Sequence, residues 1–198
     1  NTERAILDER DIRSESTGRY QVHSVTAINL KPTTTHYFTI LSGANVYDNN
    51  GVVYSVSTGK QLPEGGRKER SIGGTVLLEN GEPARGVLVI LTMDGAQPLS
   101  ALSKDSEEYL IPLTNLRALD LGTYYTPLDT DSIDVAFTDG KISSTVRTLF
   151  KNSGNIPSIT LGRQYDFTVE NVETTPIASP SSSFTRPKGS KSTIQKNP

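Results

Sequence analysis

Residues 71–91 hold two runs of β-forming residues on either side of a tight-turn signal. Asn80-Gly81 is the strongest short signal for such a turn. Because side chains alternate along a strand, each run puts its apolar residues on one face: Ile72, Gly74, Val76 and Leu78, then Val87, Val89 and Leu91. The stretch predicts a β-hairpin that opens a β-domain.

The chain of 198 residues has 16 glycines and 11 prolines, a composition typical of many turns and short strands. Roughly seven short strands fit between residues 71 and 170, which is the spacing of an antiparallel sandwich. Two alternating apolar sets support this interpretation: Tyr109, Ile111 and Leu113, and Ile133, Val135 and Phe137. We expect an all-β chain of two antiparallel β-sandwich modules, the first one incomplete, with a disordered C-terminal tail.

The first third of the chain predicts fewer strands. Residues 1–19 are charged and offer a short edge strand at best. Residues 20–30 and 35–41 are rich in β-formers, and His36, Phe38 and Ile40 would share a face of the second strand. Residues 52–57 would return after the Asn-Gly turn.

Residues 5–60 resemble the second half of a bacterial fibronectin type III domain. The motifs that carry the likeness are Leu30-x-Pro32-x-Thr34, Ser42-Gly43, the turn Tyr47–Gly51, and a strand that ends in Ser57-Thr58-Gly59. His36 takes the place of the tyrosine that ties the family's corner to the backbone. The resemblance implies that three strands are missing, so either an upstream segment or another chain would complete the sheet by strand addition.

Residues 70–170 resemble the carboxypeptidase regulatory-like sandwiches, a transthyretin-like group that merges with the collagen-adhesin B-type repeats. The motifs are Gly74-x-Val76, Asn80-Gly81-x-Pro83, Gly86-Val87-x-Val89 and Tyr109-x-Ile111. The resemblance implies a rigid, non-catalytic module that serves as a spacer or binding unit on a secreted protein.

These observations divide the chain into four parts. Residues 1–60 form a partial fibronectin-like module, residues 61–70 a linker, residues 71–171 the second sandwich, and residues 172–198 a Ser/Thr/Pro-rich basic linker or tail. The four basic residues after position 173 leave a net charge of −6 on the rest of a chain whose total is −2.

Several kinds of chemistry lack their sequence requirements. The absence of cysteine excludes disulfides, thiolate metal sites and a cysteine nucleophile. The sequence has neither a Gly-x-Ser-x-Gly elbow nor a phosphate-binding glycine loop. It also has no basic footprint for nucleic acid and no apolar run near the ~20 residues that insert across a bilayer. We therefore predict that the chain is not an enzyme and has no catalytic residues.

Asp129, Asp131 and Asp134 are the metal candidates, because calcium takes hard oxygen ligands from a loop. The EF-hand pattern is absent, so solvated loop acids remain the alternative interpretation. His23 and His36 lie thirteen residues apart and would need a third ligand to hold a metal.

Exposed tyrosines can stack on sugars. Tyr124 and Tyr125, with Tyr47 and Tyr54, are the candidates for a glycan platform, although tyrosines that only pack their rings would show the same pattern.

The leading expectation is a non-catalytic structural or adhesive segment of a bacterial secreted or cell-surface protein, located outside the cell. Its partners would be other domains of the same polypeptide or another surface protein. Two alternatives stay open: a calcium- or glycan-binding module, and an accessory domain of an extracellular hydrolase whose catalytic part lies outside this chain.

Overall fold

The computed structural model describes residues 4–63, 70–104, 106, 108–169 and 175–176. Strands dominate this part of the chain, and its helices are the short α1 (Glu9–Ser14) and the 3-10 helix η1 (Phe150–Asn155). The predicted all-β class is confirmed. None of the described helices is long and apolar enough to cross a membrane.

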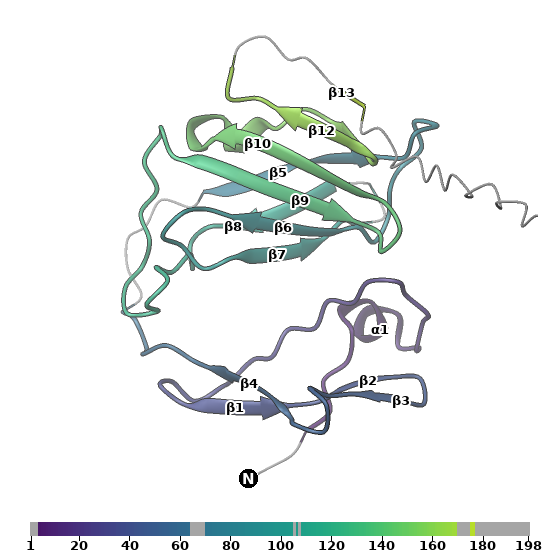
Figure 1. The fold of residues 1–198 in the computed structure, drawn as a ribbon, viewed down its shortest axis with the longest axis vertical. Helices are drawn as coiled ribbons and strands as arrows, with labels where there is room; N and C mark the ends of the chain where they lie inside the picture. Colours follow the sequence, from purple (N-terminus) through teal and green to yellow (C-terminus); the bar gives the residue numbers. More distant parts are fainter. Residues whose placement is uncertain (1–3, 64–69, 105, 107, 170–174, 177–198) are drawn as a thin grey trace, which may run out of the picture.

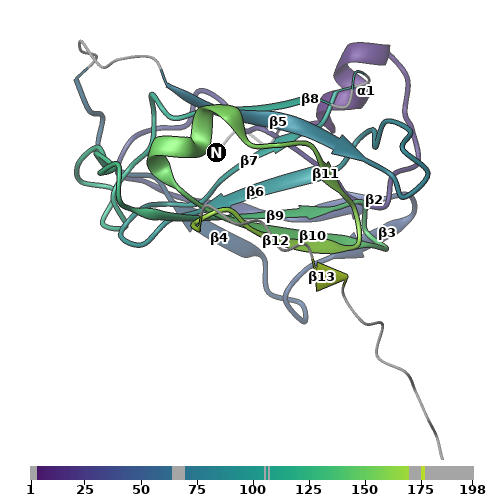
Figure 2. The ribbon, with the colours of Figure 1, turned by 90° about the horizontal axis from the view of Figure 1, so that it is seen from above.

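Two sheets form a sandwich from residue 71 onwards, and Figure 2 shows them as separate layers. The larger sheet has six strands in the order β13 (Thr175–Pro176), β12 (Arg163–Asp166), β10 (Ser143–Leu149), β9 (Ser132–Thr138), β6 (Leu88–Thr92) and β7 (Leu99–Leu102). The smaller sheet has three, in the order β11 (Ile159–Thr160), β5 (Ser71–Leu77) and β8 (Glu108–Pro112). All neighbours pair antiparallel except β10 with β12 and β11 with β5.

The predicted hairpin over residues 71–91 is wrong. The Asn80-Gly81 turn does form, with Gly81 at φ 82° and its N–H donated to Leu78 O at 2.9 Å. The returning chain stays beside β5 only for a bridge between Leu77 and Pro83, and β6 then joins the opposite sheet. Both strands carry an apolar face, and placing them in facing layers buries the two faces against each other.

The crossing from β5 to β6 is held by Ser103, which is buried. Its hydroxyl donates to Ala84 O at 2.8 Å and accepts from Val87 N at 3.0 Å. The connector therefore has its backbone polar groups satisfied inside the protein, as buried groups require.

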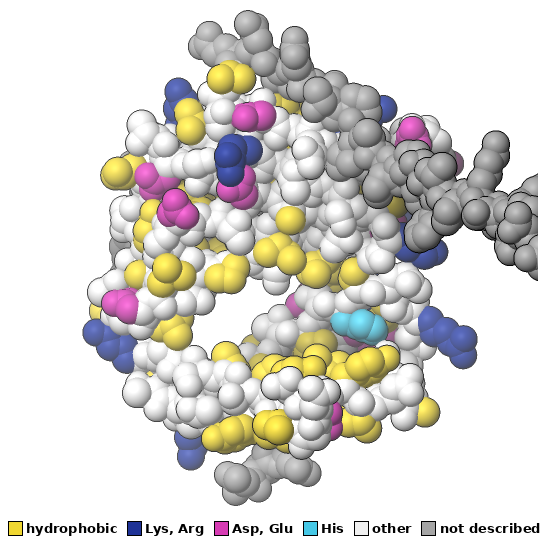
Figure 3. All heavy atoms as spheres, viewed as in Figure 1, with side chains coloured by type: hydrophobic (Ala, Val, Ile, Leu, Met, Phe, Trp, Pro, Cys, Tyr) yellow, Lys and Arg dark blue, Asp and Glu magenta, His cyan; other side chains and the backbone are white. Residues whose placement is uncertain are grey.

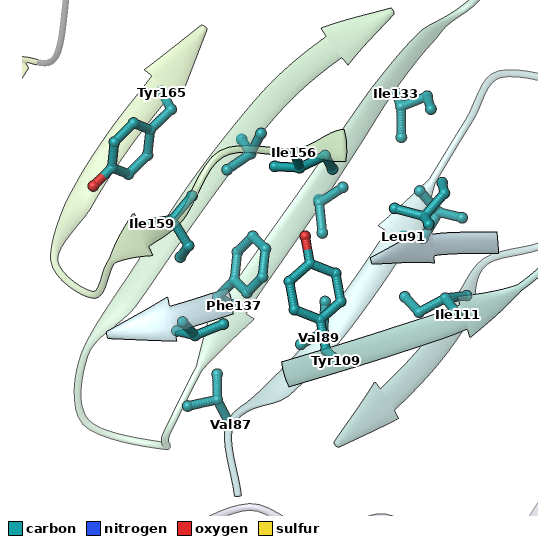
Figure 4. Close-up of a cluster of buried hydrophobic side chains, with 14 of the residues drawn as sticks. Val87, Val89, Leu91, Tyr109, Ile111, Ile133, Phe137, Ile156, Ile159 and Tyr165 are labelled. Atoms are coloured by element: carbon teal, nitrogen blue, oxygen red, sulfur yellow. The ribbon is translucent and has the colours of Figure 1, made fainter. Parts of the chain in front are cut away.

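The core lies between the two sheets and follows the predicted alternation (Figure 4). Ile133, Val135 and Phe137 are buried on β9, while the residues between them face solvent. From the other layer, the ring of Tyr109 meets Phe137 edge to face, with 5.2 Å between the ring centroids. Ile111 and Leu113 are buried beside it, as expected.

The described residues before the sandwich form no comparable core. Asp8 is the only residue buried among residues 4–63. The strands of this region form two separate two-stranded antiparallel sheets, which we call ribbons. In one, β1 (Thr35–Phe38) pairs with β4 (Tyr54–Ser57), and in the other β2 (Ile40–Ser42) pairs with β3 (Asn45–Tyr47). Figure 1 shows both ribbons on one side of the sandwich.

Three expectations for this region are wrong. The charged N-terminal segment contains α1 in place of an edge strand, because the side chain of Asp8 caps the helix by accepting from Arg10 N. Residues 20–30 have no strand structure, and the strand expected over residues 35–41 is interrupted at Thr39. A strand needs a neighbour to satisfy its backbone groups, and residues 20–30 pair with no described strand.

A hydroxyl on β10 fastens the turn between β11 and β12. Ser144 is buried, and its Oγ accepts from Gly162 N at 2.8 Å and Arg163 N at 3.2 Å while donating to Thr160 O at 3.3 Å. The hydroxyl of Tyr165 accepts from Thr160 N at 2.8 Å. One short loop thus depends on two buried hydroxyl groups.

We predict that Ser144→Ala lowers the free energy of unfolding by about 1–3 kcal/mol, because it leaves buried backbone donors without a partner. Ser143→Ala, at the exposed neighbouring position, is the control and should change it by less than about 0.5 kcal/mol. Urea unfolding of both variants gives the comparison. Equal stability of the two variants would contradict the role of Ser144.

Candidate functional site

The three aspartates of the predicted calcium loop each have a separate partner. Asp134 forms a two-point ion pair with Arg147, at 2.8 and 3.1 Å. Asp129 lies 3.5 Å from the guanidinium of Arg70. Asp131 accepts from Tyr125 Oη at 3.2 Å and from Leu128 N at 2.9 Å, which closes the loop.

No group of three Asp, Glu, His or Cys side chains in the described part of the chain is arranged to hold a metal ion. The two histidines have different neighbours: His23 Nδ1 lies 3.4 Å from Asp8 Oδ2, and His36 Nε2 lies 3.3 Å from Lys31 O. Asp129, Asp131 and Asp134 therefore form ion pairs and turn hydrogen bonds, and the two histidines make separate local contacts.

The candidate glycan tyrosines are divided in the same way. Tyr125 packs against the core, where burial and its hydrogen bond to Asp131 raise the pKa of its hydroxyl. Tyr124 lies under the guanidinium of Arg117, 6.0 Å from the ring centroid. Tyr54 stacks on Phe38 at 5.4 Å, whereas Tyr47 is half exposed. The four rings therefore do not share one role.

The sequence did not predict the most densely hydrogen-bonded polar group in the described part of the chain. It is centred on Asp8, and we call residues 8–26 the N-terminal clasp. Asp8 accepts two hydrogen bonds from the guanidinium of Arg10, both at 2.9 Å, and one from Ser24 N at 3.1 Å. The Arg10 hydrogen bond is the main cause that holds the pKa of the Asp8 carboxyl far below its usual range, against the opposing effect of burial.

Arg10 connects the two ends of the clasp. Its guanidinium donates to Val22 O at 2.5 Å and stacks on the ring of Tyr20, 3.5 Å from the centroid. Tyr20 in turn donates to Asp11 Oδ1 at 2.9 Å. In the sequence, Asp8 stands before a segment with acidic residues, which is typical of a helix N-cap. This pattern does not indicate which residues would bond to Asp8.

The clasp and the ribbons touch the sandwich at separate points. A β-carbon at Gly86 would lie 3.1 Å from Arg10 Nη1, and one at Gly140 would lie 2.7 Å from Gln21 Cβ. A separate contact follows the ribbons in sequence, where the guanidinium of Arg117 donates to Lys60 O at 2.8 Å. Figure 3 shows an opening that remains between the two parts.

A cleft of about 350 Å³ lies between the clasp and the outer face of β6 and β7. Its walls are mixed: Leu88, Ile90 and Leu99 come from the sheet, and Glu9, His23 and Thr26 from the clasp. Glu9 Oε1 already accepts from Ser24 Oγ at 3.0 Å and Thr26 Oγ1 at 2.7 Å. The cleft offers an apolar wall and a polar rim whose carboxylate is hydrogen-bonded to two hydroxyls.

A second, shallow cleft of about 440 Å³ lies on the outer face of the six-stranded sheet. Arg147 stands there beside Asp134 and Asp166, and the hydrogen bond to Asp134 raises the pKa of its guanidinium. The guanidinium in this cleft is already paired with Asp134, and the pair is exposed on the sheet surface.

The clasp should respond to acid. Because the pKa of Asp8 is depressed in the folded chain, its stabilising contribution is full above the ordinary carboxyl range and is lost as pH falls towards the folded value. We expect Asp8→Asn to release Ser24 at neutral pH, seen as a shift of the Ser24 amide resonance by NMR. The exposed Glu15→Gln is the control, and an unchanged Ser24 resonance in Asp8→Asn would contradict the clasp.

Comparison of the chain with protein-family models, with curated proteins and with solved structures found no match in any of the three. The likenesses to fibronectin type III and carboxypeptidase regulatory-like domains therefore stay predictions from sequence motifs.

Proposed function

We propose that this chain is a non-catalytic structural or adhesive segment of a bacterial secreted or cell-surface protein. The observation that carries the proposal is the interior of the sandwich. Among its described residues, no Asp, Glu, Lys, Arg or His side chain is buried, and the buried hydroxyls of Ser103 and Ser144 bond to backbone groups in turns. Such an interior gives a stiff scaffold.

The polar chemistry at the surface agrees with this role. Reactive sites combine perturbed ionisable groups with a cavity that excludes water. Asp134 is paired with Arg147, Asp131 accepts a hydrogen bond from Leu128 N in a turn, and both clefts are open to solvent. The candidate acidic groups of the loop are therefore occupied by neighbours.

The location outside the cell rests on two sequence properties. A chain without cysteine folds without disulfides in any redox compartment, as bacterial surface proteins often do. The motif resemblances point to module types common on secreted proteins. The expected partners are other domains of the same polypeptide or another surface protein, and strand addition to the ribbons of residues 35–57 is the mode that supports such contacts.

The location is tested with antibodies raised against the purified chain. We expect them to label intact cells that make the protein, and brief protease treatment of whole cells to remove the label. A cytoplasmic protein assayed in parallel is the control for lysis. Labelling only after permeabilisation would overturn the extracellular part of the proposal.

Calcium should not stabilise the chain. Binding at the predicted loop would have to break the Arg147–Asp134 pair and the two hydrogen bonds that Asp131 accepts. We expect the melting temperature to be the same in millimolar calcium and millimolar magnesium, because a ligand raises it only when it binds the folded state. A rise with calcium alone would favour the calcium-binding alternative.

A further inference from the structure

Strand β4 has an open edge, as do the outer strands of the other sheets in the described part of the chain. Strand β4 pairs with β1 along one side, and no described strand pairs with its other side. In Figure 1 this ribbon lies apart from the sheets of the sandwich. An unpaired edge presents a row of backbone donors and acceptors to any chain that can lie beside it.

The residues that present those groups can be identified from one hydrogen bond. Thr58 N donates to Thr34 O at 3.0 Å. Bonded and non-bonded pairs alternate along an antiparallel ladder, so Val56 and Tyr54 bond inward to β1. The N–H and C=O groups of Val53, Ser55 and Ser57 therefore point to the open side.

This edge has none of the usual protections against pairing. Residues 49–59 contain no charged residue and no proline. Val52, Val53 and Val56 are 61%, 47% and 50% exposed. Natural edge strands are commonly guarded by lysine, proline or a bulge, and an uncharged run of β-formers without them is prone to pair with its own kind.

We propose that the occupant of this edge is a second copy of the same chain, paired antiparallel through β4 about a twofold axis at Ser55. Ser55 then lies opposite the partner's Ser55, and Val53 opposite the partner's Ser57. All three outward-facing residues exchange hydrogen bonds. The pairing goes beyond the proposed scaffold role and depends on it only for its cellular setting.

The side chains fit this register. Tyr54 comes to lie opposite the partner's Val56, an aromatic and β-branched pair of the kind that stabilises sheets. Because the run is uncharged, no charged side chain meets its own copy across the axis. A strand from a charged partner would find no opposite charge on this edge, so charge favours self-pairing.

Neighbouring registers match fewer of the three outward-facing residues with one another, because an axis at Tyr54 or Val56 leaves Ser57 or Val53 opposite a glycine. Gly59 lies close to the sandwich, since a β-carbon there would lie 2.6 Å from Leu121 O. An axis at Val53 would use Gly51, whose N–H is already donated to Asp48 Oδ1 at 2.9 Å. The axis at Ser55 leaves the whole free edge available.

Cysteine crosslinking tests the register, since the chain has no cysteine of its own. Across a hydrogen-bonded pair, the Cα atoms of two Ser55→Cys copies would lie about 5.5 Å apart, within the range of about 4.4–6.8 Å that a disulfide spans. In the matched variant Ser57→Cys the same atoms would be about 14 Å apart, from the rise per residue. With oxidised glutathione we expect Ser55→Cys dimers to form at least about tenfold faster.

A charge on the edge tests the pairing without a crosslink. Ser55→Lys places two like charges opposite each other across the axis and should abolish the concentration-dependent dimer in sedimentation equilibrium. Thr35→Lys is the control, because it adds the same charge to the same face of the ribbon but on β1, away from the axis. The Thr35→Lys chain should dimerise as the parent chain does.

Three results would overturn the proposal: a parent chain that stays monomeric into the millimolar range, equal crosslinking rates for the two cysteine variants, or equal dimerisation of the two lysine variants. A monomeric parent would leave the edge to a strand of another protein, and it would leave the scaffold role and its cell-labelling test unaffected.

Discussion

The sandwich depends on two apolar faces that meet between its layers. One belongs to β5 and β8 and the other to β6 and β9, where Val89, Val135 and Phe137 lie. Strands that are neighbours in sequence separate into opposite sheets because a shared sheet would leave one apolar face of each open to water. Buried hydroxyls then hold the crossings that this separation requires: that of Ser103 between β5 and β6, and those of Ser144 and Tyr165 between β11 and β12. A packed apolar interior and a few obligatory hydrogen bonds at its margins together define one rigid body.

The region before the sandwich is organised by the opposite principle. Its long apolar side chains, among them Tyr37 and Leu41 at 70% exposure, find no second layer to cover them. Polar contacts replace a core: Asp8, Arg10 and Ser24 hold the clasp, and Arg117 fastens Lys60. Contacts of this kind fix positions but bury little surface, so the two ribbons keep apolar faces and free edges. In our proposal the capacity to interact lies in this region, and the sandwich serves as the scaffold.

The sequence predicted well what depends on the period of two. The buried sets on β8 and β9 emerged directly, because alternation states which residues face inward. Prediction from the sequence was wrong where the structure of a segment depends on residues distant in the chain. The Asn80-Gly81 turn was correct, yet the strands beside it were assigned to one hairpin, since a local pattern does not reveal which sheet a strand joins. Residues 20–30 have the composition of a strand without a neighbour to pair with, and propensity alone does not replace that neighbour.

The same limit explains the candidate sites. In the sequence, the spacing of Asp129, Asp131 and Asp134 suggests a set of metal ligands. The sequence does not show the side chains that contact them in the folded chain. Arg70 lies far away in the sequence and pairs with Asp129, while Arg147 lies opposite Asp134 on the neighbouring strand β10 and pairs with it. Among the residues that the structure describes, Asp8 is the one buried carboxylate, because Arg10 and the backbone of Ser24 surround it. Because Asp129, Asp131 and Asp134 have partners within the chain, our proposal for recognition rests on backbone groups, those of the open edge of β4.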